Sequence, residues 1–287
     1  MTCGHAVSCG RYLIVSASGR FKYHFKFSGY HDHIKMTQYS EGGYEMAYQT
    51  VFKRYELKYI VTREQKARLL AAMEPYMMSD QYGRSTIRNI YFDTDDYILA
   101  RHSIAKPDFK EKLRIRSYAK ADADSTVFVE LKRKYDHVVY KRRVAMSESD
   151  SMAWTAGHKE TEETGQMSDE INYFLSYYRE LHPAVFLSYE REAYKMKPSE
   201  ASGTDADFRV TFDENILFRD HDIALSADVY GTPLMEDGKV LMELKCSGGI
   251  PLWMVHVLSS EHIYKTSFSK YGTAYTRYIS KGPKLPA

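Results

Sequence analysis

Glu243-Leu244-Lys245 repeats a tripeptide that occurs twice earlier in the chain, as Glu56-Leu57-Lys58 and Glu130-Leu131-Lys132. Each copy lies in a stretch whose pattern predicts a β-strand. Successive side chains of a strand point to opposite faces, so in each copy Glu and Lys share one face while Leu occupies the other. The three copies therefore predict a sheet with one apolar face and one ionic face.

Further predicted strands place Lys or Arg at alternate positions. They contain Arg114 with Arg116, Lys141 with Arg143, Arg191, and Arg209. One such strand is most often a solvated outer surface with cross-strand ion pairs. The same cationic bias over five or six strands would be repulsive unless an anion filled that face. Closing the sheet with its apolar face outward puts the charges in a hydrated lumen that opens to a polyanion, because unpaired buried ions are costly.

The remaining pattern indicates seven or eight short strands and few long helices, which is typical of a largely antiparallel sheet. Thr62-Arg63-Glu64-Gln65 is a capping box that predicts a helix to about Met78. Strands are expected over 86–93 and, as a weaker pattern, over 223–229. Residues 169–181 are expected to form an aromatic-rich helix.

The glutamates on the ionic face indicate a metal. A carboxylate repels a phosphate unless a divalent cation lies between them, and Mg²⁺ or Mn²⁺ is commonly held by one or two carboxylates plus phosphate oxygens. Glu56, Glu130 and Glu243 fit that role. Arg supplies bidentate phosphate contacts and Lys a compact charge. This inventory suffices for phosphoryl transfer, in which positioning and charge neutralisation carry most of the catalysis.

Composition excludes several other classes. The 287 residues carry a net charge of only +2, so the molecule as a whole is not a basic nucleic-acid binder. Three cysteines form no disulfide framework, which favours the cytoplasm, and no apolar run reaches the roughly 20 residues of a membrane-spanning helix. Neither GxGxxG nor GxxxxGK[ST] is present.

Residues 1–45 differ from the rest, being rich in Gly, Ser, His and Tyr without a sustained period. Glu41-Gly42-Gly43 can be encoded by a purine-rich stretch that resembles a ribosome-binding site, and Met46 follows a few codons later. We expect residues 1–45 to be a disordered or non-native leader and residues 46–287 to form the functional domain.

The ordered set of motifs resembles the triphosphate tunnel metalloenzymes, and most closely the VTC domain of vacuolar transporter chaperone polyphosphate polymerases. The resembling stretches include residues 54–59, 90–94, 113–118, 129–132, 189–191, 209–213, 243–245 and 267–271. Each motif is weak by itself, but together they follow the family order over roughly 230 residues. The resemblance implies an α+β fold, in which an antiparallel eight-stranded β-barrel forms a tunnel with a charged lumen, flanked by helices. The regulatory inositol-phosphate-sensing domain and the membrane segments of longer family members have no counterpart here.

The resemblance also implies roles for individual residues. Those that look like phosphate-contacting, catalytic residues are Lys58, Arg114, Arg116, Lys132, Lys141, Arg191, Arg209 and Lys270. Arg101, Arg143 and Lys245 are additional phosphate-binding candidates. Glu243 looks like the metal-binding carboxylate for Mn²⁺ or Mg²⁺. Glu130 and Glu56 are either its helpers or orienting partners for neighbouring Lys and Arg.

We therefore predict a cytoplasmic, metal-dependent polyphosphate polymerase whose ligands are ATP and inorganic polyphosphate. A tripolyphosphate or nucleoside triphosphate hydrolase on the same scaffold is one alternative, because the sequence does not display the acceptor. A non-catalytic polyphosphate-binding module is another. Nucleic acid is disfavoured by the interleaved glutamates. The sequence is compatible with a membrane partner protein, and it does not specify the nucleotide preference, the product length or the oligomeric state.

Overall fold

A computed structural model describes residues 55–105, 107–135, 138–157, 159–201 and 203–281. All of them belong to the unit Thr50–Ala287. The expected leader, residues 1–45, lies outside the described residues.

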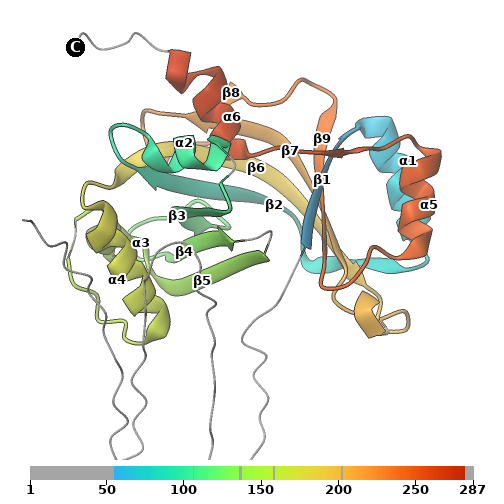
Figure 1. Ribbon diagram of the computed structural model, residues 1–287, viewed down its shortest axis with the longest axis horizontal. Coiled ribbons are helices and arrows are strands. Elements are labelled where there is room, and N and C mark those ends of the chain that lie inside the picture. Colours follow the sequence, from blue (N-terminus) through green and yellow to red (C-terminus); the bar gives the residue numbers. More distant parts are fainter. Residues whose placement is uncertain (1–54, 106, 136–137, 158, 202, 282–287) are drawn as a thin grey trace, which may run out of the picture. The chain divides into compact units, whose positions relative to one another are not determined.

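The described part of the chain contains one ten-stranded sheet, whose strands pair antiparallel. The strands are β1 (Tyr55–Thr62), β2 (Met77–Asp93), β3 (Phe109–Ser117), β4 (Thr126–Tyr135), β5 (Val138–Ser147), β6 (His182–Met196), β7 (Arg209–Arg219), β8 (Thr232–Pro233), β9 (Lys239–Cys246) and β10 (Lys265–Thr266). Their order is β10-β1-β9-β7-β6-β2-β3-β4-β5, and β8 pairs with β7 (Figure 1). The predicted antiparallel α+β fold is confirmed.

The predicted closure into an eight-stranded barrel is not confirmed. The strand path has two ends, β5 and the two-residue β10, and no backbone pairing joins them among the described residues. Side chains span the distance instead, because Lys132 of β4 forms an ion pair with Glu56 of β1. The first and last parts of the sheet therefore face each other across an ionic contact.

Six helices pack around the sheet in the described part. They are α1 (Arg63–Met73), α2 (Ile98–Ala105), α3 (Glu148–Thr155), α4 (Gln166–Tyr178), α5 (Leu252–Ser260) and α6 (Lys270–Arg277), with short 3₁₀ turns at Gly203–Asp205 and Ile279–Lys281. Helices α3 and α4 cover the apolar face of β3 and β4, where Leu113, Ile115 and Leu131 are fully buried (Figure 1). Helices α1 and α5 cover β1, β7 and β9, where Leu244 is buried. The leucines of the three tripeptides thus pack outward under helices, as predicted.

A third apolar cluster lies on the opposite face of the sheet. Tyr271 and Ala274 of α6 pack there against Tyr91, Leu187 and Leu241. These strand residues alternate with the outward-facing core residues, so α6 fills part of the inner side. The ionic side chains occupy the remainder of that side.

The structure confirms one of the local predictions and corrects two others. The capping box is confirmed, because Thr62 Oγ1 accepts from the Gln65 amide and Gln65 Oε1 accepts from the Thr62 amide. The helix ends at Met73 rather than Met78, since β2 already begins at Met77 and pairs with β6. The weakly predicted strand at 223–229 is wrong, because this stretch forms turns and loop. None of the described helices combines the length and apolar character needed to span a membrane.

Candidate functional site: a cation-lined cavity

The inner face of the sheet borders a cavity of about 2180 Å³. Among the described residues, eighteen lysine and arginine side chains line it, against five acidic ones. So large a cationic excess is stable only where water or an anion solvates it. Three carboxylates buried in or behind the wall, Glu130, Asp213 and Glu243, organise most of these cations.

Glu130, on β4, is completely buried and holds cations from two neighbouring strands. Its Oε2 accepts from Arg114 Nε at 2.9 Å and Nη2 at 2.7 Å. Its Oε1 accepts from Arg143 Nε and lies 2.7 Å from Lys141 Nζ. Burial alone would raise the pKa of Glu130, but Arg114, Arg116, Lys141 and Arg143 hold it far below its usual range. Glu130 is therefore a permanently charged anchor.

Asp213, on β7, is a second saturated anchor. Arg191 donates to both of its oxygens, at 2.6 and 2.7 Å, and Lys270 Nζ donates to Oδ2 at 2.5 Å. Burial opposes ionisation of Asp213, yet the two cations lower its pKa. Asp213 thus fixes one side chain from β6 and one from the start of α6 toward the cavity.

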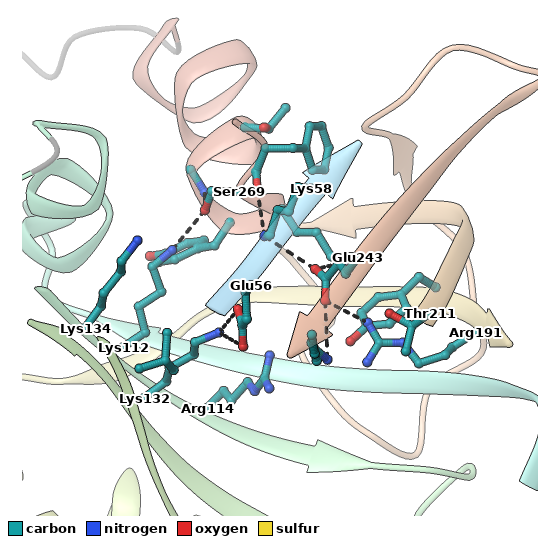
Figure 2. A pocket seen from close by; sticks show the side chains of 18 of the residues that line it. Glu56, Lys58, Lys112, Arg114, Lys132, Lys134, Arg191, Thr211, Glu243 and Ser269 are labelled. Atoms are coloured by element: carbon teal, nitrogen blue, oxygen red, sulfur yellow. Dashed lines mark hydrogen bonds and ion pairs between the residues drawn. The ribbon is translucent and has the colours of Figure 1, made fainter. Parts of the chain in front are cut away.

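Glu243, on β9, is held more loosely. Its nearest cations are Lys58 at 3.4 Å, Lys245 at 3.5 Å, Arg191 at 3.7 Å and Lys270 at 3.8 Å. Figure 2 shows Glu243 between Lys58 and Arg191. These distances exceed those of short charge-assisted hydrogen bonds. Burial raises its pKa, but the surrounding cations, led by Lys58 and Lys270, bring it well below the usual value. Glu243 is ionised and keeps its lone pairs free of short hydrogen bonds.

Glu56 of β1 forms an ion pair with Lys132 of β4, which lies near the other end of the strand order. Its oxygens lie 2.7 and 3.1 Å from Lys132 Nζ. Burial works against ionisation, but Lys132 and Lys245 lower the pKa of Glu56 to about 2. This ion pair brings β4 to the same cavity as β1.

Tyr189 is a functional candidate that the sequence interpretation missed. Its hydroxyl accepts from Arg116 Nη2 at 2.8 Å, and its ring lies under Arg191 and Lys270. Burial raises its pKa, but Arg116, Arg191 and Lys270 together lower it to about 8. The strand alternation that identified Arg191 places Tyr189 on the same face and was the available signal.

Asp213, Thr211 and Lys112 lie in stretches that the sequence analysis used, but they were not among the predicted site residues. Asp213 and Thr211 follow Arg209 at alternate positions, and Lys112 precedes Arg114 in the same way. Period-two alternation alone would have placed them on the ionic face.

Almost all predicted site residues reach the cavity. Its lining includes Glu56, Lys58, Arg114, Arg116, Lys132, Lys141, Arg143, Arg191, Arg209, Glu243, Lys245 and Lys270. Glu130 lies directly behind the wall. Arg101 is an exposed residue of α2 outside this lining, so its placement lends no support to a phosphate contact.

The three predicted metal-binding carboxylates do not converge. The described residues include no cluster of three or more His, Cys, Asp or Glu side chains suited to a metal ion. Glu130 is saturated by hydrogen bonds from cations, and Glu56 is occupied by Lys132. Of the three, only Glu243 is available as a ligand.

A divalent cation fits at Glu243 in company with a phosphate ligand. The Thr211 hydroxyl is buried without a hydrogen-bond partner, and Thr211 lies directly opposite Glu243 on the neighbouring strand. Mg²⁺ and Mn²⁺ prefer oxygen ligands and are often bound by one or two carboxylates plus substrate phosphates. Four nearby cations would repel a metal arriving alone, so the donor set fits a metal that arrives with a polyphosphate.

These features define a class of protein: an antiparallel α+β domain with a cation-lined cavity for a strongly anionic, phosphate-related ligand. The family model of the VTC domain matches residues 53–279. The chain belongs to the VTC domain family, as its motifs suggested.

Two solved structures are similar to the chain at low sequence identity. A protein of Bacillus halodurans described as a "putative adenylate cyclase" is 15% identical, covers 81% of this chain and 100% of its own, and has a TM-score of 0.46. A protein of Vibrio parahaemolyticus with the same description is 11% identical, covers 81% of this chain and 99% of its own, and has a TM-score of 0.40. No curated protein matches the chain significantly.

Proposed function

We propose that the protein is a metal-dependent polyphosphate polymerase, which transfers the γ-phosphoryl group of ATP to the end of a polyphosphate chain in the cavity. The observation that carries this proposal is the combination of a large cationic excess with carboxylates whose pKa values are all lowered. Membership of the VTC domain family supports the same reading.

The carboxylates favour a phosphate acceptor over water. Hydrolysis is helped by a general base whose pKa lies near the working pH. The carboxylates do not supply such a base, because the pKa values of Glu56, Glu130, Asp213 and Glu243 are all below the ordinary range, and no histidine is among the described lining residues. Three lining groups have pKa values closer to neutrality, namely Tyr189, Lys112 and Lys141. The Tyr189 hydroxyl is already hydrogen-bonded by Arg116, and a bound polyphosphate would keep both lysines protonated. The end of a phosphate chain is already an anion and attacks without losing a proton.

The wall of cations would position the reactants and neutralise their charge. The new bond forms between an oxygen of the chain end and the γ-phosphorus, while the bond to the β–γ bridging oxygen breaks and ADP leaves with its electron pair. Arg191 and Lys270, held by Asp213, and Arg114, held by Glu130, are rigid donors for phosphate oxygens. A bound Mn²⁺ or Mg²⁺ at Glu243 would withdraw negative charge from the same oxygens.

The test incubates the purified protein with ATP and Mn²⁺ and separates the products on a gel. We expect a ladder of polyphosphate and release of ADP. Orthophosphate without polymer would show the hydrolase alternative to be right and this proposal wrong.

A matched pair of variants separates a catalyst from a binding module. Glu243→Ala should abolish turnover while anion binding is retained or strengthened, because a negative charge leaves the cavity. Glu236→Ala, which removes an exposed acid from the cavity rim, serves as the control and should leave turnover intact. Equal turnover of Glu243→Ala and wild type would exclude a metal-ligand role for Glu243. The cytoplasmic location and a membrane partner protein remain predictions.

A further inference from the structure

Five lysines form a continuous cationic surface on β3, β4 and β5, here called the lysine wall. Its members are Lys110, Lys112, Lys132, Lys134 and Lys141, all of which line the cavity. The strand register places Lys112 opposite Lys132 and Lys132 opposite Lys141, and one step further Lys110 opposite Lys134. Figure 2 shows Lys112, Lys132 and Lys134 side by side on one wall.

Like charges directly opposite each other on a sheet destabilise it. Carboxylates offset this repulsion at Lys132, which pairs with Glu56, and at Lys141, which pairs with Glu130. Lys112 donates to Ser269 Oγ at 2.9 Å, and within the described residues neither Lys112 nor Lys134 forms an ion pair with a carboxylate. The lysine wall therefore retains uncompensated positive charge.

The half-buried position of Lys112 makes this charge energetically unfavourable. Burial, followed by the repulsion of Lys58 and Lys132, lowers the pKa of Lys112 to about 7. An anion placed between Lys112, Lys132 and Lys134 would remove the repulsion. Cations arranged at a cost to the free protein are typical of a binding surface, because that cost is recovered when the ligand binds.

Apart from Lys141, which Glu130 holds, the lysine wall extends away from the cations that Glu130 and Asp213 hold. Arg114 pairs with Glu130, and Lys112 and Lys110 follow it along β3 toward the strand end. At about 3.3 Å per residue, Lys110 lies roughly 13 Å from Arg114 along the strand. A ligand held at Arg114, Arg191 and Lys270 can reach Lys134 only if it is long and linear.

We infer that the lysine wall is a separate subsite, which binds the part of a linear phosphate chain beyond the triphosphate unit and selects long chains over short ones. This inference rests on the proposed function in one respect, since it takes the ligand to be inorganic polyphosphate. It assigns Lys112 and Lys134 to retention of the chain, while the cations held by Glu130 and Asp213 contact the reacting triphosphate. Retaining the chain between transfers would let the protein extend one polymer repeatedly.

The test compares the binding of tripolyphosphate and long-chain polyphosphate to the double variant Lys112→Gln/Lys134→Gln. The control is Lys120→Gln/Lys159→Gln, which changes the net charge equally at two exposed positions outside the cavity lining. The wall variant should bind long chains about tenfold or more weakly, as expected for two lost charge contacts. The slope of log K against the logarithm of the salt concentration should become shallower by roughly 1.4. Its affinity for tripolyphosphate should match that of the control.

Two further readouts separate binding from a structural role. Without ligand, the wall variant should melt at a higher temperature than wild type, because repulsion between opposed lysines is relieved. Lys112→Arg/Lys134→Arg should restore the preference for long chains, since both charges return. The inference would be overturned if the wall variant melted at a lower temperature and Lys112→Arg/Lys134→Arg did not restore the preference for long chains.

Equal loss of affinity for tripolyphosphate and long chains would place the lysine wall inside the triphosphate site and refute the separate subsite. No loss for either ligand would refute it as well. Single-stranded oligothymidylate serves as a competitor, and if it bound as tightly as polyphosphate in a wall-dependent manner, the ligand class would be wrong. If the wild type made no polymer but its wall-dependent preference for long chains persisted, the inference would hold and the proposed function would fail.

Discussion

Glu130 and Glu243 are both buried and both surrounded by cations. Removal of the charge of Glu130 should mainly lower stability, whereas removal of the charge of Glu243 should mainly lower turnover. Glu130 makes hydrogen bonds of 2.7–2.9 Å to Arg114 and Arg143, with Lys141 at 2.7 Å. The cations around Glu243 lie 3.4–3.8 Å away. The substitutions Glu130→Gln and Glu243→Gln keep the side-chain volume and remove one negative charge each.

The expected magnitudes follow from these contacts. Breaking a buried ion pair by removing one partner costs about 3–5 kcal/mol, because the remaining charge is buried without compensation. Glu130→Gln leaves Arg114 in this state and should lose stability of that order, which corresponds to a fall in Tm of roughly 6–20 °C for a domain of this size. Glu243 makes no short charge-assisted hydrogen bond, so Glu243→Gln should cost less than about 2 kcal/mol.

The assay is urea unfolding of wild type and both variants, with and without tripolyphosphate. An anion that binds only the folded state stabilises it, and it should stabilise Glu130→Gln more than wild type because it replaces a missing negative charge. Glu243→Gln should keep its fold and its anion binding but lose metal-dependent turnover.

The result that would refute this reasoning is a reversed order of stability. If Glu243→Gln unfolded more readily than Glu130→Gln, the short contacts of Glu130 would not be the principal structural ones. Loss of turnover in Glu130→Gln, at a temperature where it is fully folded and saturated with ligand, would assign Glu130 a direct role in catalysis.

Two further predictions concern protons and the Thr211 hydroxyl. Burial, together with nearby cations, lowers the pKa values of Lys112 and Lys141 to about 7. A bound polyanion raises these pKa values again. Polyphosphate binding should therefore be accompanied by proton uptake at pH 8 and by less uptake at pH 6, where both lysines are already protonated. Calorimetry in buffers of different ionisation enthalpy measures this uptake, and Lys112→Arg should reduce it because arginine stays charged; equal uptake at both pH values would contradict the lowered pKa values. Thr211→Val removes a buried hydroxyl that has no partner, so the unliganded protein should be as stable as wild type or more stable, whereas the increase in tripolyphosphate affinity caused by Mn²⁺ should shrink. Thermal melting with each ligand alone and with both together measures the two effects, and an undiminished Mn²⁺ effect would exclude Thr211 as a metal ligand.

The sequence alone determined which side chains share a face. Alternation along a strand is a local property, so Lys58 with Glu56 and Arg114 with Arg116 could be assigned to the ionic side without knowledge of the fold. The burial of Leu131 and Leu244 under helices followed from the same alternation. The capping box at Thr62 was readable too, because its hydrogen bonds join residues three apart.

Only the tertiary structure decided which of these residues meet. Strand order and register depend on contacts between distant segments, and β9 lies between β1 and β7 in this sheet. That placement sets Glu243 between Lys58 and Thr211, and it makes Asp213 the anchor of Arg191 and Lys270. It also decided between the two roles that the sequence left open for Glu56 and Glu130, because both carboxylates pair with cations of the cavity. The protonation of Lys112 depends on distances to charges from other strands, so no local pattern could have revealed it.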